Sequence, residues 1–193
     1  MNILDIGALA QSEALANGSL TARALMEATL ERIDAVNGAV NAIVALRPRA
    51  ELLAEADRAD ATPRVGWLHG IPIAIKDLSD AEGLPTAKGS PLFAGTIAQK
   101  DSVFVARIRA AGAIIIGKTN TPEFGLGSHT FNPVYGPTRN PYDHTRSAGG
   151  SSGGAAAALA TGMLSIADGS DMMGSLRNPA GWNNVYGMRP SWG

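Results

Sequence analysis

Two short apolar runs with a helical pattern between them constrain the fold more than any other feature of this chain. The runs, Ile71 to Ile75 and Ala113 to Ile116, are rich in β-branched residues and have the length of buried strands. Residues 102–111 are amphipathic and stop at Gly112, as a helix with a glycine C-cap does. Strand, helix and strand in this order form a βαβ unit. We therefore predict an α/β fold with a mixed, largely parallel β-sheet core covered by helices on both faces.

The N-terminal part of the chain is predicted to be helical. Residues 21–36 place apolar side chains in one stripe among charged ones, with Ser19 and Thr21 as candidate N-caps. A second helix rich in Ala and Glu spans residues 48–60 and ends before Pro63. Residues 124–146 are rich in Gly, Pro, Asn, Ser and Thr and are expected to be dominated by loops. We predict one domain over residues 1–193, with a helical region at 1–62 and a core at 63–193.

Composition favours a globular protein that acts on a small molecule. Of the 193 residues, 45% are hydrophobic and 17% are charged, which suits a single domain with an apolar core. Sixteen basic and seventeen acidic side chains leave a net charge of -1, so we expect neither nucleic acid nor a membrane as partner. The first residues lack a basic, apolar signal pattern, and no apolar run approaches the ~20 residues that span a bilayer. A cytoplasmic location is expected.

The absence of cysteine narrows the possible chemistry. It excludes disulfides, thiolate zinc sites and a cysteine nucleophile, so covalent catalysis would need Ser, Thr or Lys. The three histidines, His69, His129 and His144, lie in loop-like segments without the spacing of metal ligands. We interpret them as structural and expect no metal and no cofactor.

Two segments place serines in defined surroundings. Residues 149–154, GGSSGG, are named here the glycine-serine loop. They are followed by a strong helix former, Ala155 to Ala160, which indicates an ordered loop that leads into a helix N-terminus rather than a flexible linker. Residues 167–179, named here the serine turn, alternate glycines and acids around Ser175. This pattern is typical of a tight turn that presents a hydroxyl group.

These segments resemble the amidase signature family. The resemblance rests on the GGSSGG loop, on the DxxGSLRxP pattern whose Ser175 lies 24 positions after Ser151, and on PIAIKD at residues 72–77. Residues 117–124, GKTNTPEF, and 187–190, GMRP, match as well. The resemblance implies an incomplete amidase signature fold in which Ser175 is the nucleophile, Lys76 the base and Ser151 the relay between them. It also implies a cis peptide bond before Ser151.

Elementary chemistry agrees with these implied roles. A serine hydroxyl is a poor nucleophile until a base removes its proton. Lysine can be that base only when it is neutral, so its ordinary pKa of ~10.4 must be lowered by burial. Lys76 closes an apolar strand, where burial is available. A hydroxyl both donates and accepts, so Ser151 can pass a proton from Ser175 to Lys76.

The resemblance also implies how the serine turn stabilises negative charge. The backbone N–H groups of Met172, Met173 and Gly174 would form the oxyanion hole. Ser170, Asp171 and Arg177 would have supporting roles, the last two by holding the turn through hydrogen bonds. The family usually has glycine at the position of Met173, and a methionine there would be strained if its φ angle were positive.

A competing motif is present at residues 112–119. They match the phosphate-binding pattern GxxxxGK[ST], which would make the chain a nucleotide-binding protein. In that motif the four variable positions form a loop after a strand, whereas residues 113–116 form an apolar, β-branched run preceded by a helix. This order of elements argues against the nucleotide-binding alternative, and we expect Lys118 and Thr119 to brace the catalytic loops from a neighbouring strand.

The predicted function is hydrolysis of a small, non-peptide carboxylic amide to an acid and ammonia or an amine, without a cofactor. Members of the amidase signature family are usually more than twice as long as this chain. A second hypothesis is therefore a non-catalytic, truncated fragment that exposes apolar surface. Such a fragment would self-associate or pair with the missing C-terminal half.

Overall fold

A three-stranded sheet forms the centre of the protein. The computed structural model describes residues 2–191, and its main sheet has the strand order β1 (Ile43–Leu46), β3 (Ile114–Thr119), β2 (Pro72–Lys76). Strand β2 pairs with β3 in parallel, and α4 (Val103–Ala110) lies between them in the chain. This arrangement confirms the predicted βαβ unit. Strand β1, which was not predicted, pairs with β3 antiparallel, so the sheet is mixed.

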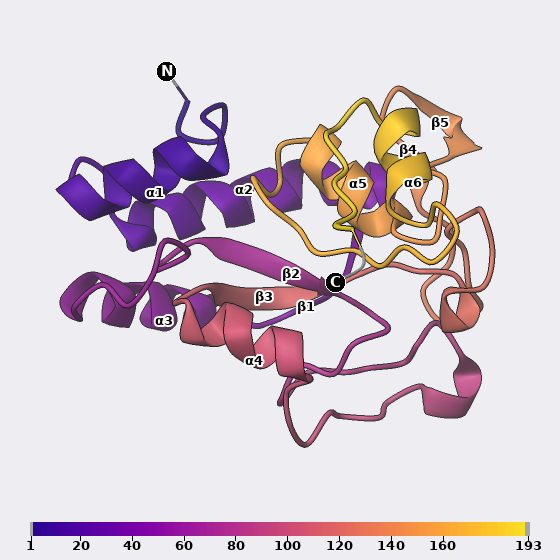
Figure 1. The fold of residues 1–193 in the computed structure, drawn as a ribbon, viewed down its shortest axis with the longest axis horizontal. Coiled ribbons are helices and arrows are strands. Elements are labelled where there is room, and N and C mark those ends of the chain that lie inside the picture. The colour runs from indigo at the N-terminus through magenta and orange to yellow at the C-terminus, as the bar shows by residue number, and fades with distance from the viewer. Residues whose placement is uncertain (1, 192–193) are drawn as a thin grey trace.

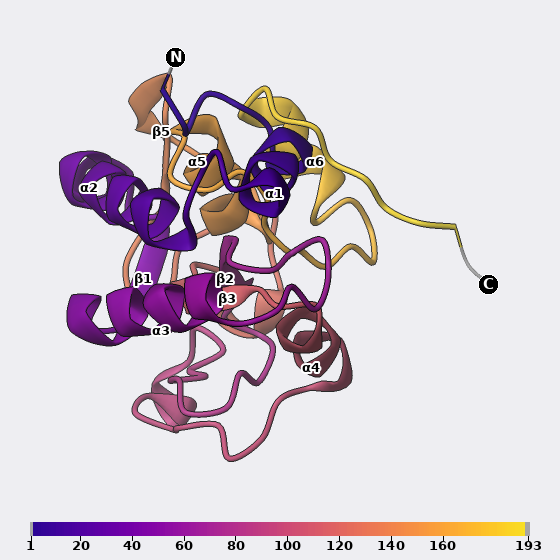
Figure 2. The same cartoon turned by 90° about the vertical axis from the view of Figure 1, so that its left-hand side faces the viewer.

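Helices cover both faces of this sheet (Figures 1 and 2). The remaining α-helices are α1 (Ala8–Asn17), α2 (Ala22–Val40), α3 (Arg49–Ala61), α5 (Gly153–Ala160) and α6 (Arg177–Trp182). Helix α2 begins as predicted, because Thr21 Oγ1 accepts a hydrogen bond of 3.1 Å from the Ala24 N–H. The predicted fold class is confirmed.

The alternation of side chains along β3 divides the core in two. Ile114 and Ile116 join the cluster that contains Met26 and Leu30 of α2 and two alanines of α5, Ala157 and Ala158. Ile115 joins the other cluster, which contains Val105 of α4 and the isoleucines of β2. Successive residues of a strand face opposite sides, so one buried run supports both helical layers.

A small hairpin interrupts the segment that was predicted to be loops. Strands β4 (Arg139–Asn140) and β5 (Asp143–Ser147) pair antiparallel near α5 and α6 (Figure 1). The residues of β5 are polar and mostly exposed, so the sequence has no alternation of apolar side chains that would predict this strand. The rest of the irregular structure includes two short 3₁₀ turns, η1 (Pro91–Phe93) and η2 (Glu123–Gly125).

The fold brings the predicted motifs to the end of the parallel strands. Lys76, the last residue of β2, is the register partner of Thr119, the last residue of β3. Helix α5 begins directly against this edge, since the Gly154 N–H donates to the Asn120 carbonyl at 3.2 Å. A side chain at Gly154 would collide with the backbone of Asn120, which explains the glycine at this position. Within residues 2–191, no helix has the length and apolar character needed to cross a membrane.

Candidate active site

Lys76 is the centre of a buried cluster of hydroxyl groups. Its side chain is 1% exposed, and its Nζ donates to Ser151 Oγ at 2.7 Å, Ser152 Oγ at 2.9 Å and Ser170 Oγ at 2.9 Å. The predicted neighbours Ser151 and Ser170 are thus brought to the lysine. Ser152 was not assigned a role from the sequence. The sequence feature that could have identified Ser152 is its position next to Ser151 in the glycine-serine loop.

Burial lowers the pKa of Lys76 to about 8, although negative charges on Asp168 and Asp171 act in the opposite direction. At this pKa roughly a tenth of the molecules carry an uncharged amine at pH 7. A group that titrates near neutral pH is suited to accept and return protons.

Asp168 lies directly against the lysine backbone and was missed by the sequence reasoning. Its Oδ1 accepts a hydrogen bond of 2.8 Å from the Lys76 N–H. Burial raises the pKa of this carboxyl to about 6. The sequence did contain a signal for Asp168. No basic residue lies close to it in the chain to form an ion pair.

The glycine-serine loop is fixed by close backbone packing. The Gly150–Ser151 peptide bond is cis, as the resemblance implied. A side chain at Gly150 would lie 2.9 Å from the backbone nitrogen of His129, so only glycine fits there. The Ser152 N–H donates to the Ser175 carbonyl at 2.9 Å, which ties the loop to the serine turn.

The Asp171 carboxylate organises the serine turn. Its side chain is 2% exposed and accepts hydrogen bonds from the N–H groups of Gly174 at 2.7 Å, Leu176 at 3.3 Å and Arg177 at 3.2 Å. The Arg177 guanidinium adds two more, at 2.9 and 3.1 Å, and holds the pKa of Asp171 far below its usual range. Arg189, to which no role was assigned, donates to the Asp171 carbonyl at 3.0 Å.

In the serine turn, the residue with a positive φ angle is a glycine. Gly174 has φ +105°, and a side chain there would meet the Asn178 amide at 2.7 Å. The φ angle of Met173 lies outside the left-handed region, so the strain considered for this methionine does not arise.

Two of the three backbone N–H groups predicted to form the oxyanion hole donate no hydrogen bond within the described part of the chain. The N–H groups of Met172 and Met173 make no hydrogen bond to residues 2–191, whereas the Gly174 N–H is held by Asp171. The N–H groups of Met172 and Met173 are therefore available to donate to a ligand, whereas that of Gly174 is not.

Ser151, Ser170 and Ser175 open into one cavity of about 450 Å³, named here the serine cavity. Its other lining residues are Leu78, Phe124, Gly125, Leu126, Gly127, Ser128, Gly150, Met172, Met173 and Asn178. Lys76 and Ser151 are hydrogen-bonded as the predicted relay requires. Within the described residues, Ser175 Oγ makes no hydrogen bond, so the contact that the relay requires between Ser151 and Ser175 is not formed, although both serines line the same cavity.

Comparison with known proteins identifies the family. The model of the Amidase family matches residues 24–193. The chain belongs to the amidase family. An acylamidase from Rhodococcus erythropolis is 42% identical over 198 residues, which cover 100% of this chain and 41% of that protein. A glutamyl-tRNA(Gln) amidotransferase subunit of Sulfolobus acidocaldarius is 40% identical over 181 residues, with 94% of this chain and 38% of that protein covered.

Solved structures of amidase signature enzymes share the fold. A bacterial aryl acylamidase of the amidase signature family superimposes with a TM-score of 0.89 at 32% identity, covering 96% of this chain and 39% of that chain. A 6-aminohexanoate cyclic dimer hydrolase gives a TM-score of 0.83 at 36% identity, covering 92% and 36%. This chain thus spans about two fifths of the length of the relatives it matches.

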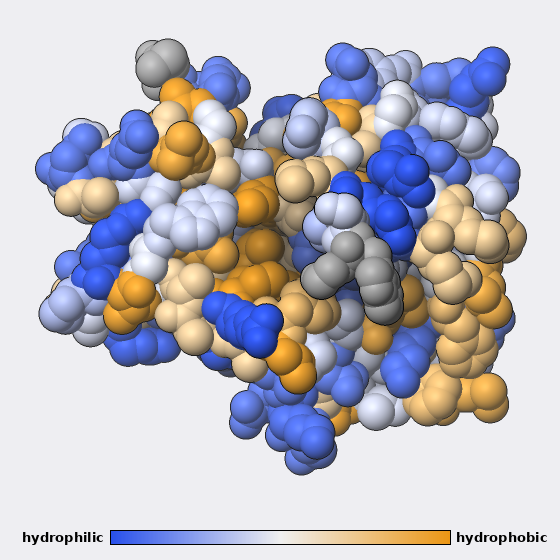
Figure 3. All heavy atoms as spheres, in the orientation of Figure 1, coloured by the Kyte–Doolittle hydropathy of each residue, from blue (hydrophilic) through white to orange (hydrophobic). Residues whose placement is uncertain are grey.

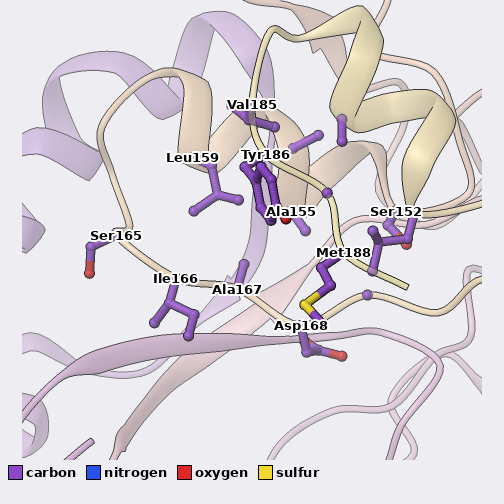
Figure 4. A pocket seen from close by; sticks show the side chains of 15 residues that line it. Ser152, Ala155, Leu159, Ser165, Ile166, Ala167, Asp168, Val185, Tyr186 and Met188 are labelled. Carbon is purple, nitrogen blue, oxygen red and sulfur yellow. The ribbon is translucent and has the colours of Figure 1, made fainter. Parts of the chain in front are cut away.

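A second cavity, named here the α5 cavity, is lined in part by Ser152. It has a volume of about 390 Å³ and is mainly apolar. Figure 4 shows Leu159, Ile166, Tyr186 and Met188 gathered between α5 and β2, with Ser152 and Asp168 at one side. Figure 3 shows apolar surface in a hollow near the middle of the same face of the molecule. The hydroxyls that bond Lys76 therefore line both cavities, Ser152 the α5 cavity and Ser151 and Ser170 the serine cavity.

The phosphate-binding alternative is wrong for this chain. Residues 114–119 form β3, so the four variable positions cannot cradle a phosphate. Lys118 is fully buried, donates to the Ser79 carbonyl and Thr86 Oγ1, and lies 3.8 Å from Asp77. Its contacts fix the segment that follows Lys76.

The histidines lie outside the serine cavity. His69 Nε2 contacts the Ala59 carbonyl at 2.9 Å, and the His129 ring lies 5.7 Å from that of Trp182. His144 belongs to β5. Among residues 2–191, the side chains of His, Asp and Glu form no cluster of three that could hold a metal ion.

Proposed function

We propose that this chain carries the catalytic residues of an amidase that hydrolyses a non-peptide carboxylic amide to an acid and ammonia or an amine. The observation that carries the proposal is the buried Lys76 Nζ, 2.7 Å from the hydroxyl of Ser151, which opens into the same cavity as Ser175. The α/β family fold and the amide-hydrolysing relatives support it.

In the first half of the reaction, Ser175 Oγ attacks the amide carbonyl carbon. Its proton moves to Ser151 Oγ as the proton of Ser151 moves to Lys76 Nζ, so the lysine becomes an ammonium. When the C–N bond breaks, Lys76 returns this proton through Ser151 to the leaving nitrogen. The acyl group stays on Ser175. Hydrogen bonds of this kind are often long in a free enzyme and shorten once substrate binds, which fits the open position of Ser175 Oγ.

In the second half, water attacks the acyl-enzyme and gives a proton to Lys76 by the same route. The bond to Ser175 Oγ breaks, Ser175 recovers the proton, and the acid leaves. The N–H groups of Met172 and Met173 stabilise the negative oxygen in both halves, because they are directed to no other acceptor within residues 2–191. The Gly174 N–H donates to Asp171 and thereby holds the turn, so it does not serve as a donor to the oxyanion.

Labelling with an alkyl fluorophosphonate followed by mass spectrometry tests the nucleophile. The adduct is expected on Ser175, to be absent in Ser175→Ala and to form at least ~100-fold more slowly in Lys76→Ala, the scale of general base catalysis. Lys100→Ala, which changes an exposed lysine, is the matched control and should label like the wild type. An adduct at another serine, or equal labelling of Lys76→Ala and the wild type, would contradict the proposal.

We further propose that residues 1–193 are one part of a longer amidase domain and that additional protein covers the α5 cavity in the active enzyme. Tyr186 and Met188, which line this cavity, are 89% and 67% exposed. Exposed apolar surface of this kind favours association with another copy or with a complementary amidase segment. If the isolated chain neither reacts with the fluorophosphonate nor hydrolyses amides, the hypothesis of a non-catalytic fragment replaces that of an enzyme for this chain. The cytoplasmic location stays a prediction.

A further inference from the structure

The backbone of Ser151 is held by a buried threonine that has no role in the mechanism so far. Thr130 is 1% exposed, and its Oγ1 donates a long hydrogen bond of 3.5 Å to the Ser151 carbonyl. Within residues 2–191, this is the only hydrogen bond to the backbone N–H or C=O group of Ser151. The backbone from which the Ser151 hydroxyl reaches Lys76 therefore depends directly on Thr130.

Thr130 also bonds the glycine-serine loop on both sides of Ser151. Its N–H donates to the Gly149 carbonyl at 2.9 Å, and its Oγ1 accepts from the Gly153 N–H at 3.1 Å. A side chain at Gly153 would collide with Thr130 Oγ1, so the loop needs glycine there to approach so closely. One threonine thus contacts the first, third and fifth residues of the loop.

Thr130 is in turn anchored to the helical and strand core. Its carbonyl accepts a hydrogen bond of 2.9 Å from the Thr138 N–H. The Thr138 hydroxyl accepts from Asn120 Nδ2 at 2.9 Å and donates to the Asn41 carbonyl at 2.7 Å. Asn120 directly follows β3, and Asn41 is the C-cap of α2. Because breaking a hydrogen bond between buried groups costs free energy, these contacts tie Thr130 to the core.

We propose that Thr130 is a positioning residue that holds Ser151 against Lys76 in the geometry that proton transfer requires. This inference rests on the proposed amidase function and deepens it, since it names a further residue on which the proton route depends. Thr130 acts through Ser151, and it is not among the residues that line the serine cavity. Without its hydroxyl, the Ser151 carbonyl and the Gly153 N–H both lose their partner, and the loop is free to move away from the lysine.

Substitutions at two buried threonines test the proposal. Thr130→Val keeps the shape and removes the hydroxyl, so kcat for hexanamide should fall at least ~10-fold with KM changed less than ~2-fold, since a misplacement of ~1 Å can cost ~100-fold in rate. Thr130→Ser keeps the hydroxyl and should retain most of the wild-type kcat. Thr138→Val is the matched control, because its hydroxyl is equally buried and makes two hydrogen bonds, neither of them to the loop.

Denaturant unfolding of the same variants separates positioning from stability. The two valine variants should lose similar free energies of unfolding, because each loses one buried hydroxyl that makes two hydrogen bonds. Should Thr130→Val fail to fold, Thr130→Cys takes its place, since a thiol is only a weak donor and acceptor.

The pKa of Lys76 gives a readout that does not depend on hydrolysis. The chain has four lysines, so NMR of protein labelled with ¹³Cε-lysine can follow each of them through a pH titration. A loosened loop admits water to the amine, so Thr130→Val should raise the pKa of Lys76, whereas Thr130→Ser and Thr138→Val should leave it unchanged. The carboxylates of Asp168 and Asp171, which also act on this pKa, are present in all the variants.

The two readouts distinguish this inference from the proposed function. A raised pKa of Lys76 in Thr130→Val, in a chain that hydrolyses no amide, supports the positioning role and overturns the hydrolytic function for this chain. An unchanged pKa together with a wild-type kcat in Thr130→Val overturns the positioning role and leaves the function intact. Equal losses of kcat in Thr130→Val and Thr138→Val also overturn the positioning role, as does a Thr130→Ser variant no more active than Thr130→Val.

Discussion

At the scale of single residues, opposing effects set the protonation of Lys76. Removal from water disfavours the ammonium form, whereas the carboxylates of Asp168 and Asp171 favour it. The hydroxyls of Ser151, Ser152 and Ser170 surround the amine in either form, because a hydroxyl can donate or accept. The residue can therefore exchange a proton without losing its hydrogen bonds.

The first prediction concerns pH. In the proposed mechanism the neutral amine of Lys76 is the active form, so kcat/KM should rise with pH and level off above an apparent pKa of about 8. Asp168→Asn removes a charge that raises this pKa, so the rise should shift to lower pH. Profiles of kcat/KM against pH for the two proteins measure the shift. Asp57→Asn, at an exposed position of α3, should leave the profile in place, and a shift to higher pH in Asp168→Asn would contradict the assignment.

The second prediction separates the two adjacent serines. Ser151→Ala breaks the proposed proton route and should lower kcat by about 10²- to 10⁴-fold. Ser152→Ala removes one hydrogen bond to Lys76 but leaves the route intact, so kcat should fall about 10-fold, the effect of one hydrogen bond to a charged group. Steady-state kinetics on one amide gives both values. Ser165→Ala, on the far side of the α5 cavity, is the control, and equal losses in the two serine variants would argue against a distinct relay.

At the scale of elements, the site depends on how closely backbones approach one another. Helix α5 reaches the end of β3 because Gly154 and the buried alanines after it add little bulk. The serine turn is wrapped around Asp171 and continues into α6, with Gly174 at the position of positive φ. Glycine is needed where a second backbone or side chain occupies the space of a Cβ atom.

The third prediction tests this requirement. Gly174→Ala should destabilise the protein by about 1–3 kcal/mol, because its φ of +105° and its contact with Asn178 both disfavour a Cβ atom. Gly181→Ala provides a matched control within α6, since open space surrounds its Cβ position and alanine favours a helix by up to ~1 kcal/mol. Denaturant unfolding compares the two. Equal stability of the two variants would show that the turn tolerates a side chain at Gly174.

At the scale of the whole molecule, the exposed apolar surface decides how the chain behaves in solution. The α5 cavity opens on the face shown in Figure 3, and Tyr186 and Met188 beside it are largely exposed. The relatives have more than half of their length outside the region matched here. This surface is therefore where contact with further protein is expected.

The fourth prediction follows from that surface. The chain should self-associate as its concentration rises, and Tyr186→Ser combined with Met188→Ser should weaken the association at least ~10-fold, because two apolar side chains leave the contact. Sedimentation velocity over a range of concentrations measures it. Leu92→Ser, at an 82% exposed position in η1, should have no effect. A monomeric wild type at all concentrations would contradict the prediction.

The sequence by itself determined the features that depend on residues close together in the chain. Periodicity predicted α2, α3, α4, β2 and β3, because each buries one stripe or one run, and the family motifs indicated Lys76, Ser151 and Ser175. The tertiary structure decided which distant groups meet. Lys76 contacts Ser152 across 76 positions and Asp168 across 92, and no local pattern encodes such pairs. Likewise, β1 and β5 depend on their ladder partners, and the serine cavity is lined by residues 124–128 and 170–178, which only the folded chain brings together.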